Sequence, residues 1–228
     1  MKYFLLILAT FLILALPAHA QSLQRVEADF SLKESDKLGN KKLSVGKVYY
    51  DKNIRVVVFQ ITFPYEEVLC VHDKGVTRFK ADTVFANVIA NGLIDFNIFQ
   101  LFLNGNLDFY GLKQSPFELK DVEEDNNKVI STWINKRSKD VGLGKILLAQ
   151  EDKAITGLIT YNDKDEIVSK QFFEEYMDVS GFKFPSQVIQ YLISGNEKEI
   201  RISNYRDIKI NNYDQKAPYD YYSKHFRK

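Results

Sequence analysis

The chain has 228 residues, a formal net charge of +1, a single cysteine and 45% hydrophobic residues. So small a net charge gives no long-range electrostatic reason to bind nucleic acid, and one cysteine excludes an intramolecular disulfide bond. The length allows one domain with a substantial core.

Residues Met1–Ala20 have the pattern of a secretory signal peptide. Lys2 supplies the early positive charge, an apolar run extends to Leu16, and Ala18-His19-Ala20 is a small-residue cleavage pattern. Cleavage after Ala20 leaves an exported chain, Gln21–Lys228, whose formal net charge is zero. We expect this chain to fold as a single domain.

The stretch from Leu23 to Lys80 predicts antiparallel strands joined by short turns. Apolar residues alternate with polar ones from Val26 to Leu32, and after a turn at Lys37–Asn40 the pattern returns. In the next strand, Ile54–Phe63, alternate positions share one face. The face with the larger apolar surface carries Arg55, Val57, Phe59, Ile61 and Phe63.

The most concentrated apolar run of the mature chain is Asp82–Asn104. Its apolar residues follow helical spacing in at least two pieces, with a break at Asn91-Gly92. Polar residues interrupt the run too often for a transmembrane helix. Two interpretations stay open: ordinary helices packed on a sheet, or a lid over an apolar ligand cavity.

The rest of the chain predicts further antiparallel strands, about ten or eleven in all. A sheet of that size curls, and its apolar concave face needs a cover, for which Asp82–Asn104 is the most apolar segment. The predicted fold is therefore mainly β, a large curved antiparallel sheet (half-barrel) under a short helical lid. The tyrosine-rich tail, Ala217–Tyr222, either covers a sheet edge or meets a partner. The later strands are expected at residues 107–112, 117–122, 129–135, 145–149, 155–161, 167–177, 184–193 and 197–210.

The sequence offers no support for catalysis, a cofactor or a metal site. Only His72 and His225 remain after the signal peptide, and His72 is interpreted as a surface residue. Cys70 lies in an apolar strand, where a buried and inert thiol is expected. No nucleophile elbow, phosphate-binding glycine loop or zinc motif is present in the sequence.

The order of these features resembles the periplasmic outer-membrane lipoprotein carrier superfamily (LolA/LolB-like). The resemblance rests on the first hairpin with Phe30 and Gly39, the strand that ends in Phe63-Pro64, the run Glu67–Gly75 and the lid-like segment after it. It implies a half-closed barrel covered by helices, with acyl chains bound between the two.

The chain departs from the pattern of that superfamily in two places. The carriers have an Arg-Pro pair whose arginine ties the lid to the sheet, whereas Lys52-Asn53 stands near that position here and Arg55 is the nearest guanidinium. The mature chain also has too few residues before Val26 for the N-terminal helix of the superfamily. Arg55 is therefore only a candidate lid latch.

The resemblance implies a non-enzymatic periplasmic carrier or chaperone. It would bind the acyl chains of a lipoprotein or lipid, move them towards the outer membrane, and make transient contact with a membrane-bound donor and acceptor. The alternative is a non-catalytic binding module for a small hydrophobic molecule or glycolipid in an envelope biosynthesis pathway. The residues expected to line the cavity are Val57, Phe59, Ile61, Phe63, Phe85, Ile89, Phe99 and Phe102.

Overall fold

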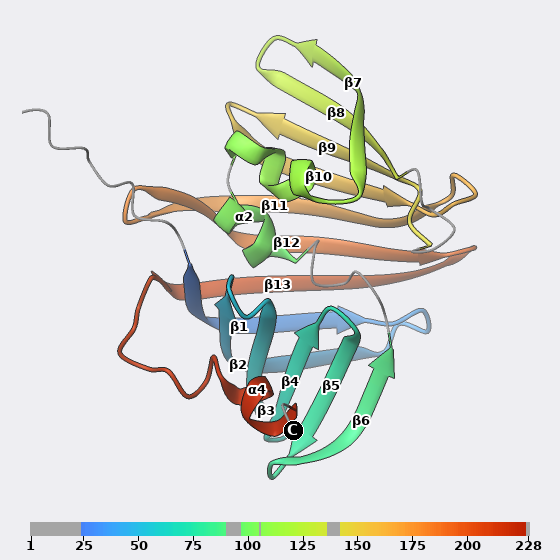
Figure 1. Ribbon diagram of the computed structural model, residues 1–228. Helices are drawn as coiled ribbons and strands as arrows, with labels where there is room; N and C mark the ends of the chain where they lie inside the picture. Colours follow the sequence, from blue (N-terminus) through green and yellow to red (C-terminus); the bar gives the residue numbers. More distant parts are fainter. Residues whose placement is uncertain (1–23, 90–96, 105, 136–141, 227–228) are drawn as a thin grey trace, which may run out of the picture.

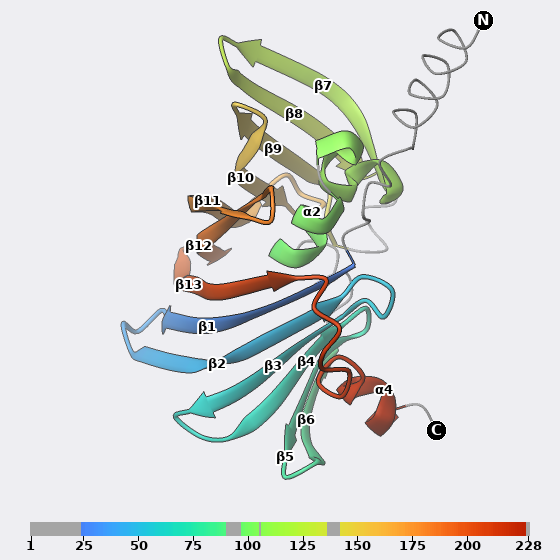
Figure 2. The same ribbon diagram turned by 90° about the vertical axis from the view of Figure 1, so that its left-hand side faces the viewer.

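The computed structural model describes residues 24–89, 97–104, 106–135 and 142–226. Its strands form one 13-stranded antiparallel sheet in the order β6-β5-β4-β3-β2-β1-β13-β12-β11-β10-β9-β8-β7. The sheet is twisted and curled but not closed into a barrel (Figures 1 and 2). The predicted fold class, a large curved antiparallel sheet with a short helical cover, is confirmed.

Two meanders make up the sheet, and they join where β1 pairs with β13. The first meander contains β1 (Arg25–Ser35), β2 (Lys41–Asp51), β3 (Val56–Phe63), β4 (Glu67–His72), β5 (Gly75–Lys80) and β6 (Thr83–Ile89). The second contains β7 (Phe117–Asp125), β8 (Lys128–Asn135), β9 (Lys145–Glu151), β10 (Ala154–Tyr161), β11 (Ile167–Val179), β12 (Phe182–Ser194) and β13 (Glu197–Ile210).

The strand order requires a long connection across the sheet. Strands β6 and β7 are consecutive in the sequence but occupy opposite edges of the sheet. The connection between them therefore has to span the whole sheet. Its described elements are the helix α2 (Ile98–Asn104) and the 3₁₀ helix η2 (Asn106–Gln114), which lie in front of the middle strands in Figure 1.

The helix predicted at the start of Asp82–Asn104 is wrong, because Thr83–Ile89 forms the edge strand β6. A register shift between Arg78 and Phe79 leaves Phe85 as an extra residue between Val84 and Ala86. This β-bulge breaks the two-residue alternation, so the apolar spacing imitates that of a helix. The predicted break at Asn91-Gly92 lies outside the described residues.

The strand predicted at Leu107–Leu112 is also wrong, since these residues belong to η2. Phe109, Tyr110 and Gly111 all have positive φ angles, of 46°, 55° and 90°. Three successive left-handed residues cannot continue a strand, whose φ angles are strongly negative. The segment instead folds back over β8–β10 and buries Tyr110 and Leu112.

The face assignment of Phe63 needs correction for a similar reason. Gly46 pairs with Ile61 and Val45 pairs with Phe63, so Thr62 is an extra residue in β3. A Cβ atom at Gly46 would lie 2.0 Å from the carbonyl oxygen of Gln60, so only glycine fits at this close approach. Because of the bulge, Phe63 shares the convex face with Val45 instead of the concave face with Ile61.

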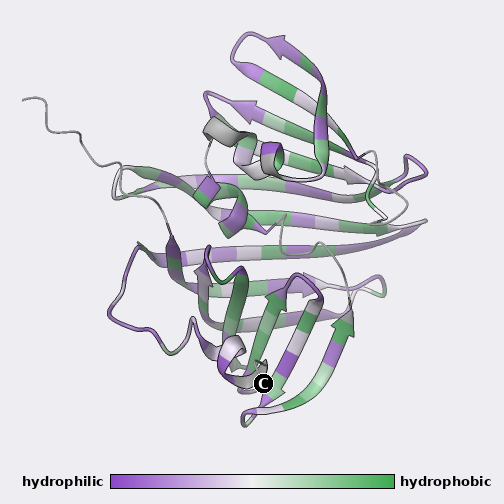
Figure 3. Ribbon diagram, viewed as in Figure 1, coloured by the Kyte–Doolittle hydropathy of each residue, from purple (hydrophilic) through white to green (hydrophobic). Residues whose placement is uncertain are grey.

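Both faces of strand β3 are buried. Val57 and Ile61 join the main core on the concave face, whereas Val56 and Val58 join a second cluster on the opposite face. In Figure 3 the first-meander strands β3 and β4 are accordingly mostly green. The sequence of a strand that is covered on both faces is a nearly continuous apolar run.

The tyrosine-rich tail covers this second cluster. Tyr219 is 2% exposed and packs edge-on against Tyr49, with ring centroids 5.3 Å apart. Tyr221 packs against Phe79, and the short helix α4 (Tyr221–Phe226) lies over β3 and β4 in Figure 1. Of the two roles left open for the tail, the structure supports the cover, although over a sheet face instead of an edge.

Cys70 lies in this cluster and is fully buried, as expected. Burial raises the pKa of its thiol to about 12. The reactive thiolate is therefore scarce at neutral pH while the tail stays in place.

His72 is buried, and its interpretation as a surface residue is wrong. Its ring stacks on Tyr222 with centroids 4.6 Å apart, and Nε2 lies 3.0 Å from Oγ1 of Thr77. Its Nδ1 accepts a hydrogen bond from the backbone N–H of Lys74 and lies 3.7 Å from the exposed carboxylate of Asp73. Burial lowers the pKa of His72, and the nearby Asp73 only partly offsets that effect.

We expect this histidine to make the fold less stable in mild acid. The unfolded chain takes up a proton near the ordinary pKa of 6.5, whereas folded His72 resists protonation until a lower pH. Below pH 6.5 the unfolded state therefore binds more protons, and stability falls with pH. Between about pH 7 and about pH 5, the melting temperature of His72→Gln should decrease less than that of the wild type. An equal decrease in both proteins would refute this assignment.

Candidate functional site

The candidate site is the concave face of the sheet together with α2. Among the described residues, no helix is long and apolar enough to cross a membrane. No group of three metal-binding side chains occurs among them either. The lining of the candidate site is mainly aromatic and aliphatic.

Helix α2 places Phe99 at the centre of an aromatic cluster. Phe99 is 1% exposed, stacks with Tyr50 and Phe184 at centroid separations of 6.1 and 6.0 Å, and meets Tyr205 edge-on at 5.4 Å. Burial raises the pKa of Tyr205 to about 12. The cluster joins α2 to β2, β12 and β13, which come from both meanders.

Phe102, one turn along α2, packs against the second meander. Its ring lies 5.6 Å from Phe173, 5.5 Å from Phe184 and 5.7 Å from Tyr110 of η2. The hydroxyl of Tyr110 donates a hydrogen bond of 3.1 Å to the carbonyl oxygen of Lys153. Together α2 and η2 fill the middle of the concave face with the protein's own rings.

Two polar contacts fix the position of α2. The side chain of Asn97 accepts a hydrogen bond of 3.0 Å from the backbone N–H of Gln100, which is an N-cap at the start of the helix. The hydroxyl of Tyr50 donates to the side-chain oxygen of Gln100. The hydrogen bond between Tyr50 and Gln100 and the aromatic contacts of Phe99 and Phe102 thus hold this seven-residue helix against the sheet.

A second part of the concave face, which we call the β4–β6 shelf, is more open. Its strand register aligns Val71, Val76 and Val88 side by side. Val88 is 56% exposed and Phe85 is 52% exposed. The shelf consists of Leu69, Val71, Val76, Phe85 and Val88.

An ion pair sits on the shelf among these apolar side chains. Nη2 of Arg78 lies 2.6 and 2.7 Å from the two carboxylate oxygens of Glu67. The Arg78 guanidinium also lies 5.3 Å from the ring centroid of Phe85. Because Glu67 neutralises Arg78, the shelf carries no net charge.

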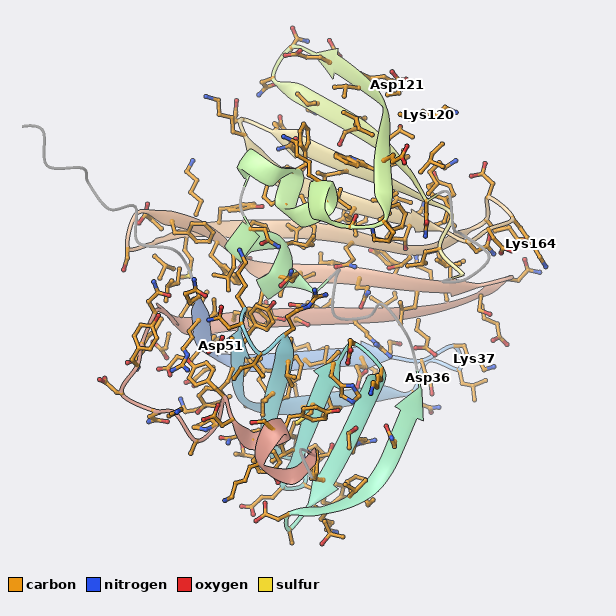
Figure 4. The ribbon with its side chains drawn as sticks, in the orientation of Figure 1. Asp36, Lys37, Asp51, Lys120, Asp121 and Lys164 are labelled. Carbon is orange, nitrogen blue, oxygen red and sulfur yellow. The ribbon has the colours of Figure 1, made fainter. Side chains whose placement is uncertain are left out.

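At the far end of the same sheet, a cavity of about 350 Å³ has a charged lining. It lies beside the β1–β2 hairpin and the start of β13, close to Asp36 (Figure 4). Arg201 stands there between Glu34, at 3.3 Å, and Glu199, at 3.6 Å. Such a lining does not suit an acyl chain, so the apolar surface near α2 remains the better candidate.

The structure brings five of the predicted cavity residues together. Val57, Phe59, Ile61, Phe99 and Phe102 belong to one concave-face core. Phe63 is 51% exposed on the convex face, and Phe85 is part of the shelf. Ile89 lies in β6 opposite Gly75. Lining of a ligand cavity by these residues stays a prediction.

Arg55, the candidate latch, lies in the turn between β2 and β3. It is exposed, it has a φ angle of 56°, and its backbone N–H donates a hydrogen bond of 2.9 Å to the carbonyl oxygen of Asp51. The contacts that hold α2 to the sheet involve Tyr50 and the aromatic cluster. A latch role for Arg55 stays a prediction.

Sequence reasoning missed the shelf and most of the aromatic cluster. The alternation at Glu67–Val71 and Val76–Lys80 was visible, but it does not show which face turns inward. Tyr50, Phe184 and Tyr205 lie in three different strands, and only the sheet register brings them together. No local signal in the sequence could have connected them.

Three solved structures are similar to this fold, although no known family model and no curated protein sequence matches the chain. A LolA superfamily protein from Nitrosomonas europaea has a TM-score of 0.57 at 12% identity, with 83% of this chain and 87% of that chain covered. A DUF1329 family protein from Desulfovibrio piger also has a TM-score of 0.57, at 11% identity, with 89% and 92% covered. A domain from Vibrio parahaemolyticus, described as an outer membrane lipoprotein-sorting protein, has a TM-score of 0.51 at 9% identity, with 89% and 92% covered.

These likenesses define the class of fold. The similarity extends over most of this chain and most of each solved chain. The protein therefore has a LolA-like fold, as the order of its sequence features indicated.

Proposed function

We propose that this protein is an exported carrier that binds acyl chains of a lipoprotein or lipid on its concave face and moves them towards the outer membrane. The observation that carries the proposal is the β4–β6 shelf, an exposed apolar surface on the same inner face of a LolA-like sheet as the core around α2. Each methylene group that such a surface buries contributes about 0.8 kcal/mol. A fatty acyl chain could therefore bind without covalent chemistry.

In this proposal α2 competes with the ligand. Phe99 and Phe102 already occupy the middle of the concave face. An acyl chain would start on the shelf and extend under α2 as the helix moves aside. Return of the helix would then favour release, because its aromatic rings bind the same surface.

The proposal includes no catalytic step and no cofactor. The concave face offers aromatic and aliphatic side chains, together with an arginine that Glu67 already neutralises. We further propose that residues 1–20 are a signal peptide removed after Ala20, that residues 21–228 form one domain, and that the mature protein works in the periplasm. Membrane-bound donors and acceptors would make only transient contacts with it.

Native mass spectrometry tests the proposal. The exported protein would be purified from the periplasm without detergent and then offered a diacylated peptide. The proposal predicts a bound lipoprotein or lipid, or uptake of the diacylated peptide. A bound small hydrophobic molecule or glycolipid, without peptide uptake, would favour the alternative of a binding module. An empty protein that takes up neither ligand would contradict both functions.

A further inference from the structure

The convex face of the second meander carries an apolar surface that no described helix covers. Figure 2 shows this side of β8–β13, on the left, without a helix. The first meander differs, because the C-terminal tail covers its convex face. Among the described residues, the tail therefore covers a cluster on the first meander, and no helix covers the convex face of the second.

The strand register shows that this surface is continuous. One row across the sheet joins Ile202, Ile189 and Phe172, and reaches Ile130 through Gly157 and Ala149. A second row joins Ile200 and Tyr191 through Lys170 to Ile159 and Leu147. We call these eight apolar side chains the convex band: Ile130, Leu147, Ile159, Phe172, Ile189, Tyr191, Ile200 and Ile202.

None of the eight side chains is buried. Phe172 is 38% exposed and Ile130 is 42% exposed, and the other six are partly exposed. The band crosses six neighbouring strands, so it is about 24 Å wide at the usual strand spacing. The convex face of an antiparallel sheet is normally polar when the other face holds the core, so this band indicates a binding surface.

The charged residue inside the two rows is Lys170, and the first row ends in charged residues, Lys33 on β1 and Glu123 on β7. Lys33 extends the first row beside Ile202, and Lys170 lies within the second. Lys198 stands next to the band, with its ammonium 4.0 Å from the ring centroid of Tyr191. Among the described residues, no carboxylate forms an ion pair with Lys33 or Lys170. Carboxylates also stand next to the band: Glu123 opposite Ile130, Asp121 on β7, Glu151 two residues after Ala149, and Glu174 two residues after Phe172.

We propose that the convex band docks reversibly on an anionic lipid surface. A second copy of the chain is a poorer occupant, because a two-fold contact centred on the band would place Lys170 of both copies close to the axis and therefore near each other. Lysine acts as a mobile point charge, whereas arginine is the residue suited to bidentate pairing with protein carboxylates. Aliphatic side chains with lysines around them match a membrane interface, where lysine stems lie along apolar surface and ammonium groups reach phosphates.

Co-sedimentation with lipid vesicles tests the proposal. Exported protein is mixed with vesicles of phosphatidylcholine containing about one third phosphatidylglycerol, or with phosphatidylcholine alone. The wild type should sediment with the anionic vesicles, and less so as salt rises. Phe172→Asp and the double variant Lys33→Gln/Lys170→Gln should each lower the partition coefficient about tenfold or more.

Leu119→Asp is the matched control. Leu119 is 45% exposed but faces the concave side, opposite Trp133. The same change of charge there should leave vesicle binding intact. Equal binding to neutral vesicles, no binding to anionic vesicles, or unchanged binding of the band variants would each overturn the proposal. Concentration-dependent dimerisation that Phe172→Asp abolishes would assign the band to a second copy and also overturn it.

The docking proposal stands apart from acyl-chain binding. The two surfaces lie on opposite faces of the sheet, so Phe172→Asp should still bind a fluorescent fatty acid as the wild type does. Loss of vesicle binding with fatty-acid binding retained is the expected pattern. A protein that binds no fatty acid but still sediments with anionic vesicles would refute the carrier function and leave the docking surface in place.

Discussion

Phe99→Ala should raise the apparent affinity for a fluorescent fatty acid by about tenfold or more. The Phe99 ring fills the surface between Tyr50, Phe184 and Tyr205, which the acyl chain would need. The apparent affinity is the intrinsic affinity multiplied by the fraction of molecules in which α2 leaves that surface open. Removing the Phe99 ring should increase this fraction. The truncation should also lower the unfolding free energy by about 3–5 kcal/mol, the usual cost of deleting a buried aromatic side chain. Fluorescence titration and chemical denaturation measure the two effects.

Two controls accompany this prediction. Phe99→Leu keeps most of the apolar volume and should change the affinity less. Phe172→Ala removes a ring from the convex face and should leave fatty-acid binding unchanged. A lower affinity in Phe99→Ala would mean that the Phe99 ring contacts the bound acyl chain instead of competing with it. Helix α2 would then be a lid over the ligand, as the sequence indicated.

Tyr219→Ala should lower the unfolding free energy by about 3–5 kcal/mol, because it removes a nearly fully buried ring. Tyr219 packs on Tyr49, and the guanidinium of Arg25 lies 4.7 Å from its ring centroid. Loss of this anchor should free the tail and open the cluster around Cys70. Labelling of the Cys70 thiol under native conditions should therefore become much faster than in the wild type.

Tyr219→Phe is the control for this prediction. It keeps the ring and removes only a hydroxyl that lies 3.5 Å from a carboxylate oxygen of Glu27. Its stability and its rate of Cys70 labelling should stay close to those of the wild type. If Tyr219→Ala kept the wild-type unfolding free energy and the wild-type rate of Cys70 labelling, the tail would not protect the cluster.

The sequence predicted the strands well wherever alternation was regular. In β1 the buried residues Val26, Ala28 and Phe30 are the apolar members of the alternating pattern. The presence of a helical cover was also predictable, since α2 lies in the part of the apolar run where Ile98–Leu103 are almost all apolar. Packing on one face of a regular element leaves a periodic trace in the sequence.

Prediction from the sequence was wrong where a β-bulge interrupted the two-residue alternation of a strand. Extra residues at Thr62 and Phe85 moved Phe63 to the convex face and made β6 resemble a helix. A bulge is a local change in register with a partner strand, so it cannot be read from one strand alone.

Long-range contacts were the other source of failure. The burial of His72 depends on Tyr222, which is far away in the sequence. The opposite edge positions of β6 and β7, which set the path of α2 and η2, depend on the pairing of β1 with β13. The edges themselves differ in a way that the sequence does show: β7 carries charges such as Lys120 and Asp121 (Figure 4), whereas Thr83–Ile89 carries none.

Binding of an acyl chain on the concave face can be located by photo-crosslinking with a diazirine-bearing fatty acid, followed by peptide mapping. We expect labelled sites on the β4–β6 shelf and on the strand positions beneath α2, around Tyr50 and Phe184. Labels confined to the convex face, with none on the shelf or beneath α2, would contradict it.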